Sequence, residues 1–364
     1  MPLADYDGHP LIRYLRDPQA ALGFGTTDWE RLLRAARHGY LSSRVAWLAT
    51  HDALITQLPE KIQFHFHSAL RVADSQAISV NWEVAQIQKA LSEPAIPFVL
   101  LKGGAYIKGQ FAAAPGRLLS DIDIMVPKAR LNDAEAALYG GGWFATKLNA
   151  YDQRYYREWM HELPPMQHLE RGTTLDLHHT ILPPTALLKP DVNLLWQAAC
   201  PIEHEKGVFV LAPVDMVLHS ATHLFHDGEL EHGLRDLVDM DALIRQFSVQ
   251  PEFFAALIER AQALQLGRPL HYALTYCKIF LHTPIPDGVF SRAMTLGSQS
   301  VMVRNIMNRV VLRSLGSILQ DKPTALSRIS EFAMYVRSHY LRMPMRLLVP
   351  HLVRKQFTDG DDAR

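Results

Sequence analysis

Residues 98–126, FVLLKGGAYIKGQFAAAPGRLLSDIDIMV, decide the fold of this chain. An apolar run ending at Leu101 leads into the pair Gly103 and Gly104, a pattern typical of a strand that turns into a helix. After a segment rich in alanine, glycine and proline, a second apolar run extends from Asp121 to Val126. The stretch therefore predicts a strand, a glycine turn, a helix and a second strand.

The second strand carries two aspartates, Asp121 and Asp123, two residues apart. Because side chains alternate along a strand, both carboxylates face one side, and Ile122 and Ile124 face the core. Neighbouring carboxylates repel each other unless a cation lies between them, and oxygen-only ligands favour Mg²⁺ or Mn²⁺ over zinc. Aspartate is a poor strand former, so the pair indicates a metal site. The alternative is a solvated strand edge.

The glycine turn suits a backbone that closely approaches an anion. Glycine has no side chain to keep a ligand away, and the first turn of a helix offers free N–H groups. The turn lacks the GK[S/T] ending of a Walker loop, and a double glycine also marks ordinary tight turns. Its position one short segment before the D-x-D strand favours phosphate binding.

Residues 166–181 predict a hairpin, MQHLE and TTLDLHHTI, joined at Arg171-Gly172. In its second arm Asp176 and His178 share a face. Asp176 is expected to complete a two-metal site and to help deprotonate an attacking hydroxyl. For His178 we expect a hydrogen-bonding role beside the site, with a direct catalytic role as the alternative.

These motifs together resemble the polymerase-beta nucleotidyltransferase superfamily, in which a strand–Gly–Gly–helix unit precedes a D-h-D-h strand and a later strand aspartate. More closely, the LKG, R-x-x-x-D-I-D and L-D-L-H motifs are similar to those of a little-characterised bacterial nucleotidyltransferase family. The motif core covers about residues 98–181, and flanking segments such as LRDLVDMDALI extend the likeness loosely over most of the chain.

The resemblance implies that Asp121 and Asp123 bind the metal and that Asp176 is the third catalytic acid. It also implies a set of nucleotide-binding residues around the glycine turn: Lys102, Gly103, Gly104 and Arg117. The segment 105–120 between the glycines and the D-x-D strand is longer than the spacing in the wider superfamily.

The implied reaction is attack by an acceptor hydroxyl on the alpha-phosphate of an NTP such as ATP, with pyrophosphate leaving. A protein side chain, an RNA end and a small hydroxylated molecule all remain possible acceptors. Two alternative functions would use the same residues. One is a non-catalytic, antitoxin-like module that binds nucleotide or a protein partner, and the other is a metal-dependent phosphohydrolase. The presence of all three carboxylates favours an active transferase.

Helical patterns flank the motif core. Apolar residues at three- and four-residue spacing predict helices in 27–93, capped at Thr27-Asp28 and ended by Pro94 and Pro97, and again from Pro213 onward. Further strands are expected at 143–144 and 207–212. We therefore expect an α+β fold with an N-terminal helical region (1–95), a nucleotidyltransferase core (96–212) and a C-terminal helical domain (213–364).

The composition gives no global sign of a nucleic-acid partner, because 37 basic and 37 acidic side chains cancel. Cys200 and Cys277 predict buried free thiols in a reducing compartment. Residues 1–18 lack the apolar region of a signal peptide, and no apolar run has the length of a membrane span. We expect a cytoplasmic protein.

Four patterns carry weaker signals. Two acids beside Arg235, Asp236 and Asp239, predict a surface or capping ion pair, and the pair 161–162 is expected to border the cleft. The basic stretch 301–357 predicts a packed helical end with a solvated face, or alternatively contact with an anionic membrane surface or RNA. A histidine-rich stretch offers a metal site, helix packing or a face turned to the cleft: His219, His223, His226 and His232.

Overall fold

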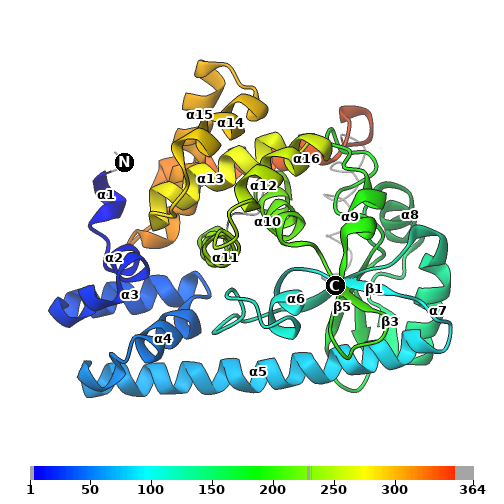
Figure 1. Cartoon of the computed structure of the whole chain (residues 1–364), viewed down its shortest axis with the longest axis horizontal. Helices are drawn as coiled ribbons and strands as arrows, with labels where there is room; N and C mark the ends of the chain where they lie inside the picture. Colours follow the sequence, from blue (N-terminus) through cyan, green and yellow to red (C-terminus); the bar gives the residue numbers. More distant parts are fainter. Residues whose placement is uncertain (1–3, 228–229, 231, 349–364) are drawn as a thin grey trace, which may run out of the picture.

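The computed structural model describes residues 4–227, 230 and 232–348, and it has the expected α+β fold (Figure 1). In this part of the chain one seven-stranded sheet has the order β3-β4-β5-β2-β1-β7-β6. The strands are β1 Phe98–Leu100, β2 Asp121–Met125, β3 Trp143–Ala145, β4 Met166–His168, β5 Thr174–His178, β6 Cys200–Pro201 and β7 Val208–Val210. All the strands expected from the sequence are confirmed.

The centre of the sheet is β2, the strand that carries the paired aspartates. It runs antiparallel to β1 and parallel to β5, which makes the sheet mixed. The hairpin of β4 and β5 is antiparallel, as expected. Along β2 and β5 the alternation of side chains is clear, since Ile122, Ile124, Leu175 and Leu177 are all buried in the core.

The N-terminal part of the chain is helical, as expected: α1 Ala4–Asp7, α2 Pro10–Arg16, α3 Thr26–His38, α4 Ser42–His51 and α5 Glu60–Ser92, with 3-10 turns η1 Pro18–Gly23 and η2 Ile55–Gln57. Helix α3 begins one residue before Thr27, and the Asp28 carboxylate accepts a hydrogen bond from the Gly25 N–H. The 33-residue α5 ends just before Pro94. In Figure 1 it runs along one edge of the molecule from the N-terminal helices to the sheet.

Shorter helices connect the strands, and longer ones follow them. They are α6 Lys102–Lys108, α7 Leu131–Gly140, α8 Ala150–Trp159, α9 Val192–Ala198, α10 Pro213–Thr222, α11 Gly233–Phe247, α12 Phe253–Ala263, α13 Gly267–Leu281, α14 Asp287–Gly297, α15 Val301–Leu315 and α16 Ala325–Arg342. Single turns are η3 Lys128–Arg130 and η5 Ser317–Leu319, and η4 His223–Asp227 is a π-helix. Pro213 is the first residue of α10, where its missing N–H costs no hydrogen bond.

Two hydrophobic cores hold these elements together. The first joins the sheet to one half of α5 and to α7, α10 and α12, so that Val84, Leu138 and Leu218 belong to the same core as Ile122. The second joins the N-terminal helices to the C-terminal ones, so that Leu32 and Val45 share a core with Leu237 and Leu315. The first and last helical regions of the chain therefore stabilise each other.

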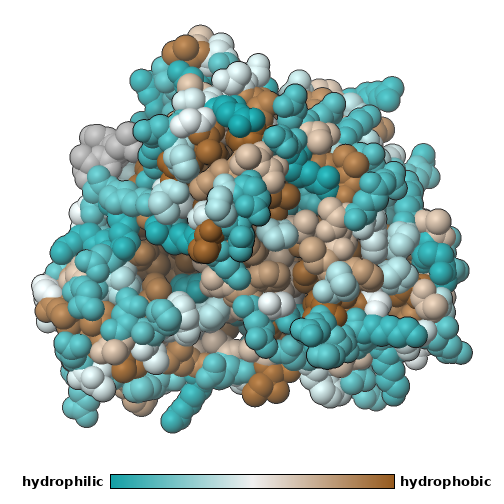
Figure 2. Space-filling view, in the orientation of Figure 1, coloured by the Kyte–Doolittle hydropathy of each residue, from teal (hydrophilic) through white to brown (hydrophobic). Residues whose placement is uncertain are grey.

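Hydrophilic side chains cover most of the face in Figure 2, and hydrophobic patches break this surface along the edge where α5 runs. Exposed apolar residues of α5 include Phe64 and Ile78, and α16 exposes Ile329 and Phe332. No described helix combines the length and apolarity needed to cross a bilayer. Contact of the basic stretch 301–357 with a membrane surface or RNA stays a prediction, and its last part, 349–357, lies outside the described residues.

Candidate active site

Two neighbouring parallel strands bring the predicted acids together. In the register of β2 and β5, Asp123 lies directly beside Asp176, and Asp121 lies beside Thr174. Because paired residues of adjacent strands project to the same face, Asp121, Asp123 and Asp176 share one side of the sheet. The sequence could place each aspartate on its own strand face, but the adjacency of β2 and β5 comes from the fold.

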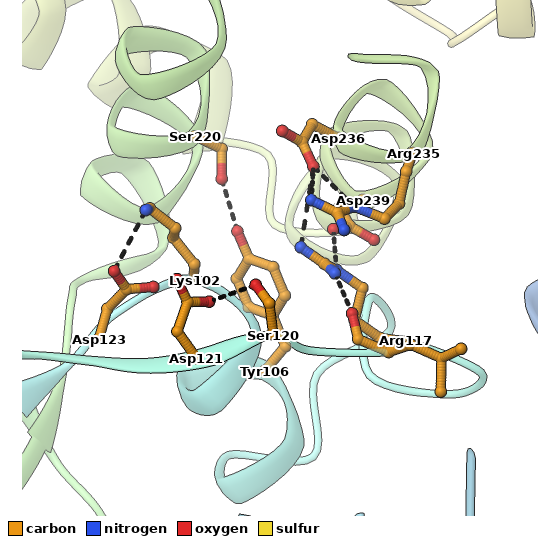
Figure 3. Close-up of polar contacts among 11 residues, drawn as sticks. Lys102, Tyr106, Arg117, Ser120, Asp121, Asp123, Ser220, Arg235, Asp236 and Asp239 are labelled. Carbon is orange, nitrogen blue, oxygen red and sulfur yellow. Dashed lines mark hydrogen bonds and ion pairs between the residues drawn. The ribbon is translucent and has the colours of Figure 1, made fainter. Parts of the chain in front are cut away.

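Oxygen and nitrogen atoms of Asp123, Asp176 and His178 lie within 4.8 Å of one another, a spacing that could hold a metal ion. The half-buried Asp121 follows the same strand face, next to Asp123, and points into the open pocket (Figure 3). It accepts a hydrogen bond of 2.9 Å from Ser120 Oγ. Among the described residues, Asp121 stands at the rim of this cluster.

Asp123 is only 4% exposed and contacts two cationic or potentially cationic groups. Lys102 Nζ lies 3.2 Å from its Oδ1, and His178 Nε2 lies 3.0 Å from the same oxygen. Burial alone would raise the pKa of Asp123, but the Lys102 ammonium and the His178 hydrogen bond hold it well below its usual range. Burial opposes the charge on His178, yet Asp123 and Glu162 raise its pKa.

Asp176 has the opposite electrostatic character. Burial raises the pKa of this carboxyl to about 8, and the charges of Asp123 and Glu162 add to the effect. Its Oδ1 is buried without a hydrogen-bond partner among the described residues. An oxygen in this position needs a proton or a cation, because an unpaired buried polar atom is costly. Together with Asp123 and His178, Asp176 forms a donor set whose spacing could hold a divalent cation.

The two glycines of the turn lie in different environments. Gly103 lines the pocket beside the aspartates, and an added Cβ there would overlap Leu119 Cδ2. A Cβ on Gly104 would meet only Ile122 and Leu100, at ordinary van der Waals distances of 3.7 Å. Lys102, just before the pair, has a φ of +43°, a strained conformation for a non-glycine residue. The structure thus brings Lys102 and Gly103 to the pocket and leaves Gly104 in the core.

A cavity of about 260 Å³ opens beside Asp121 and Asp123, between the sheet and helices α10 and α11 (Figure 3). Its lining is strongly polar: Lys102, Gly103, Tyr106, Arg117, Leu119, Ser120, Asp121, Asp123, Ser220, His223, His232, Arg235, Asp236 and Asp239. The Tyr106 hydroxyl and Ser220 Oγ form a hydrogen bond across it. No sequence motif marks Tyr106 or Ser220, because apolar helix patterns surround both in the sequence.

Arg117 also lines the cavity, but its guanidinium already has carboxylate partners. Its Nε donates to Asp239 Oδ2 at 2.6 Å, and its Nη2 lies 3.7 Å from Asp236 Oδ1. Asp239 is 3% exposed, so the prediction of a surface or capping ion pair is wrong for this residue. Asp236 does contact Arg235 at 3.1 Å. The long segment 105–120 is thereby tied to α11.

Three further side chains hold the 105–120 segment. Gln76 of α5 forms two hydrogen bonds with the backbone of Leu119, of 2.7 and 2.8 Å. Arg44 of α4 donates to the Ala112 carbonyl at 3.1 Å, and the Gln246 side chain of α11 accepts from the Ala112 N–H at 2.7 Å. Because Leu119 immediately precedes Ser120 and Asp121, these contacts position the start of β2.

The histidine-rich stretch turns partly toward the cavity. His223 and His232 line it, which confirms the alternative of a face turned to the cleft. Burial lowers the pKa of His219 and His226 to about 3 and that of His223 well below its usual range. In the described part of the chain none of these histidines joins a group with metal-binding spacing.

A second hollow reaches the Asp121 carboxylate from another side. A groove of about 1020 Å³ runs between α5 and the turn of the β4–β5 hairpin. It shares Leu119, Ser120 and Asp121 with the cavity, and Trp82 and Arg171 are part of its lining. The Arg171 guanidinium lies over the Trp82 ring, 4.9 Å from the ring centroid. Asp121 is therefore accessible from two directions.

Comparison with known sequences adds one finding. Residues 25–282 match the sequence model of a family described as "Uncharacterised nucleotidyltransferase". The match covers most of the chain, from α3 to the end of α13, and includes every residue of the site described above. No curated protein and no solved structure matches.

Proposed function

The chain belongs to this nucleotidyltransferase family, and from that premise we propose that it transfers a nucleoside monophosphate from an NTP to an acceptor hydroxyl. One observation carries the proposal, the placement of Asp123 and Asp176 side by side on β2 and β5 with Asp121 next to them. Divalent cations, Mg²⁺ or Mn²⁺, would be held by these three carboxylates and would neutralise charge on the phosphates during transfer.

The surrounding residues supply binding and orientation. We assign the triphosphate to the cavity, where Gly103 leaves space beside the carboxylates and Lys102 provides an ammonium group. Arg117 shapes the cavity through its ion pair with Asp239, and its share in nucleotide binding stays part of the proposal. His178 orients Asp123 through their hydrogen bond. Fixed positions of this kind lower the barrier by arranging reactants before the reaction.

The reaction forms a bond between the acceptor oxygen and the alpha-phosphorus and breaks the bond to pyrophosphate. The acceptor hydroxyl must lose its proton, and in this proposal the Asp176 carboxylate takes it. The groove beside α5 gives the acceptor a separate path to Asp121, so that nucleotide and acceptor enter from different sides. Both cysteines are free thiols, and Cys277 is buried as expected, but the expectation is wrong for Cys200, which is half-buried.

The test is transfer by the Asp121→Ala variant. Wild-type protein is incubated with each labelled NTP and Mg²⁺, and label is sought on protein, RNA and small molecules. We expect Asp121→Ala to lose transfer by about 1,000-fold, since a catalytic cation supplies several kcal/mol. The fold should persist, because Asp121 is half-buried on the open side of the site. The exposed Asp133, paired only locally with Arg130, provides the control variant Asp133→Ala.

The outcomes separate the alternatives. Label on an acceptor identifies the acceptor class, whereas label released only as free nucleotide indicates a phosphohydrolase. NTP binding without any turnover, equal in wild type and Asp121→Ala, indicates a non-catalytic binding module. Undiminished transfer by Asp121→Ala would refute the site.

A further inference from the structure

A second group of potential metal ligands lies next to the carboxylates. His161, Glu162 and His178 each offer one ligand atom, and these atoms lie within 4.8 Å of one another. The group differs from the aspartate cluster because two of its three donors are imidazole nitrogens. Nitrogen-rich donor sets favour zinc and related transition metals over magnesium.

The backbone places these residues firmly. Residues 161–163 lie antiparallel to the end of β5, with hydrogen bonds from Leu163 N to the Leu177 carbonyl and from His179 N to the His161 carbonyl, both 2.9 Å. These two bonds flank the pair of Glu162 and His178, which are direct partners across the strands. In such a non-hydrogen-bonded pair the side chains stand especially close. A site built on paired strands is geometrically well defined.

Two distances between ligand atoms are close to those of tetrahedral coordination. His178 Nδ1 lies 3.5 Å from Glu162 Oε2, and His161 Nε2 lies 3.9 Å from the same oxygen. Two ligands that each lie ~2.0–2.2 Å from a tetrahedral zinc ion stand about 3.4 Å apart. The rings of His161 and His178 are adjacent and tilted by 40°, with centroids 5.2 Å apart. Only small side-chain adjustments would close this group around one ion.

The ligand nitrogen of His178, Nδ1, is buried and has no hydrogen-bond partner among the described residues. His161 presents Nε2 to Glu162, and its Nδ1 is likewise buried without a partner in this part of the chain. The side chains of His161 and His178 are 8% and 3% exposed. His178 uses its other nitrogen, Nε2, to contact Asp123 Oδ1 at 3.0 Å. A carboxylate that holds one imidazole nitrogen and leaves the other for a metal is the usual support of a histidine ligand.

We propose that His161, Glu162 and His178 bind one zinc-like divalent cation, with a fourth position open to water. This site goes beyond the proposed transfer reaction and does not depend on it. Because His178 is shared, the bound cation would fix the ring orientation with which His178 holds Asp123. The zinc-like cation would therefore help to position Asp123, a ligand of the proposed catalytic cation.

The experiment uses the full chain, stripped of metal, and Co²⁺ as a spectroscopic substitute for zinc. Excess Mg²⁺ occupies the carboxylate cluster, so the signal reports the site with two imidazole ligands. We expect one equivalent of Co²⁺ with the visible absorption of a four-coordinate ion, displaced by one equivalent of Zn²⁺. Glu162→Gln and His161→Ala should abolish this absorption. The exposed neighbours Glu203 and His204 form a surface pair, so His204→Ala controls for adventitious binding.

Two aspartate variants test whether Asp123 supports His178 as a ligand of the zinc-like cation. Asp123→Asn should weaken Co²⁺ binding by ~10–100-fold, as expected when the group supporting a histidine ligand is lost. Asp121→Asn should leave Co²⁺ binding unchanged. Equal binding by Asp123→Asn and wild type would overturn the shared role of His178.

A measurement on wild-type protein alone covers the case in which the buried variants fail to fold. X-ray absorption of the protein with one equivalent of zinc should show two imidazole ligands and a short oxygen shell. Fewer than two imidazoles, no stoichiometric binding, or unchanged binding in a folded His161→Ala variant would overturn the proposal. Absence of nucleotidyl transfer in the same preparation would affect only the proposed function.

Discussion

At the scale of single residues, the two central acids differ because their partners differ. Asp123 faces Lys102 and His178, which favour its charged form. Asp176 lies beside the charges of Asp123 and Glu162 and has a buried oxygen without a partner. An acid that is hard to ionise without a cation becomes a good metal ligand once the cation is present.

The first residue-scale prediction concerns Asp176→Asn, which mimics the protonated acid. The folded carboxyl has a pKa of about 8, far above the ~3.9 of an unfolded chain. Between these values the folded state holds more protons, so metal-free wild type loses stability as the pH rises from about 4 to about 8. The variant should therefore unfold at a higher temperature than wild type near pH 8 and at a similar one near pH 4.

Thermal unfolding in a chelator, followed by circular dichroism across this pH range, measures the difference. Asp133→Asn, at an exposed position, is the control and should show no such trend. A difference between Asp176→Asn and wild type that does not change with pH would contradict the assignment.

At the scale of elements, the turn from β1 into α6 and the 105–120 segment form the cavity. Leu119 covers Gly103, and Gln76 of α5 holds the Leu119 backbone. The long 105–120 spacer is therefore an ordered wall of the site. Its contacts come from α4, α5 and α11.

Adjacent glycines provide a matched comparison at this scale. Gly103→Ala should lower both the melting temperature and NTP affinity, because its Cβ would displace Leu119 from the cavity wall. Gly104→Ala should fold normally, since its Cβ has ordinary contacts with Ile122 and Leu100. Thermal unfolding and equilibrium binding of a fluorescent NTP analogue measure the two effects. Equal behaviour of the two variants would show that Leu119 does not define the cavity.

The contact of α5 with the spacer gives another prediction. Gln76→Ala removes two hydrogen bonds to the Leu119 backbone, each worth about 0.5–1.5 kcal/mol, and frees the residues before Asp121. We expect lower stability and a loss of transfer rate of about tenfold, measured by chemical unfolding and initial rates. Gln88 also lies on α5 but contacts the distant Lys206 carbonyl, so Gln88→Ala should keep the wild-type rate. A matching loss in Gln88→Ala would argue against a local effect.

At the scale of the whole molecule, the N-terminal and C-terminal helices share one hydrophobic core. Leu32 and Leu237 belong to this common core. The N-terminal helices also contact the spacer directly, because Gly116 packs against the backbone of Ser43 and Arg44 at the start of α4. Stability of the helical regions and geometry of the site are therefore linked.

Gly116→Ala tests this link. Gly116 has a φ of +72°, and a Cβ there would lie 2.6 Å from the α4 backbone. Gly207 has a similar φ of +79° but open space around it, so Gly207→Ala isolates the backbone strain of about 1–2 kcal/mol. We expect Gly116→Ala to be clearly less stable than Gly207→Ala and to lose transfer activity. Equal melting temperatures would show that the packing of the spacer on α4 is unimportant.

The sequence by itself determined the local structure. Strand alternation placed Asp121 and Asp123 on one face, and the glycine pair marked the turn into α6. The L-D-L-H segment placed Asp176 on a strand. These features depend on backbone stereochemistry over a few residues, which periodicity reports directly.

Only the tertiary structure decided which remote groups meet. It set β5 beside β2, so that Asp176 adjoins Asp123, and it paired Arg117 with Asp239 in the interior. It also brought the 161–162 segment to His178. Such contacts depend on how whole helices and strands pack to bury apolar surface, and no local pattern records that choice.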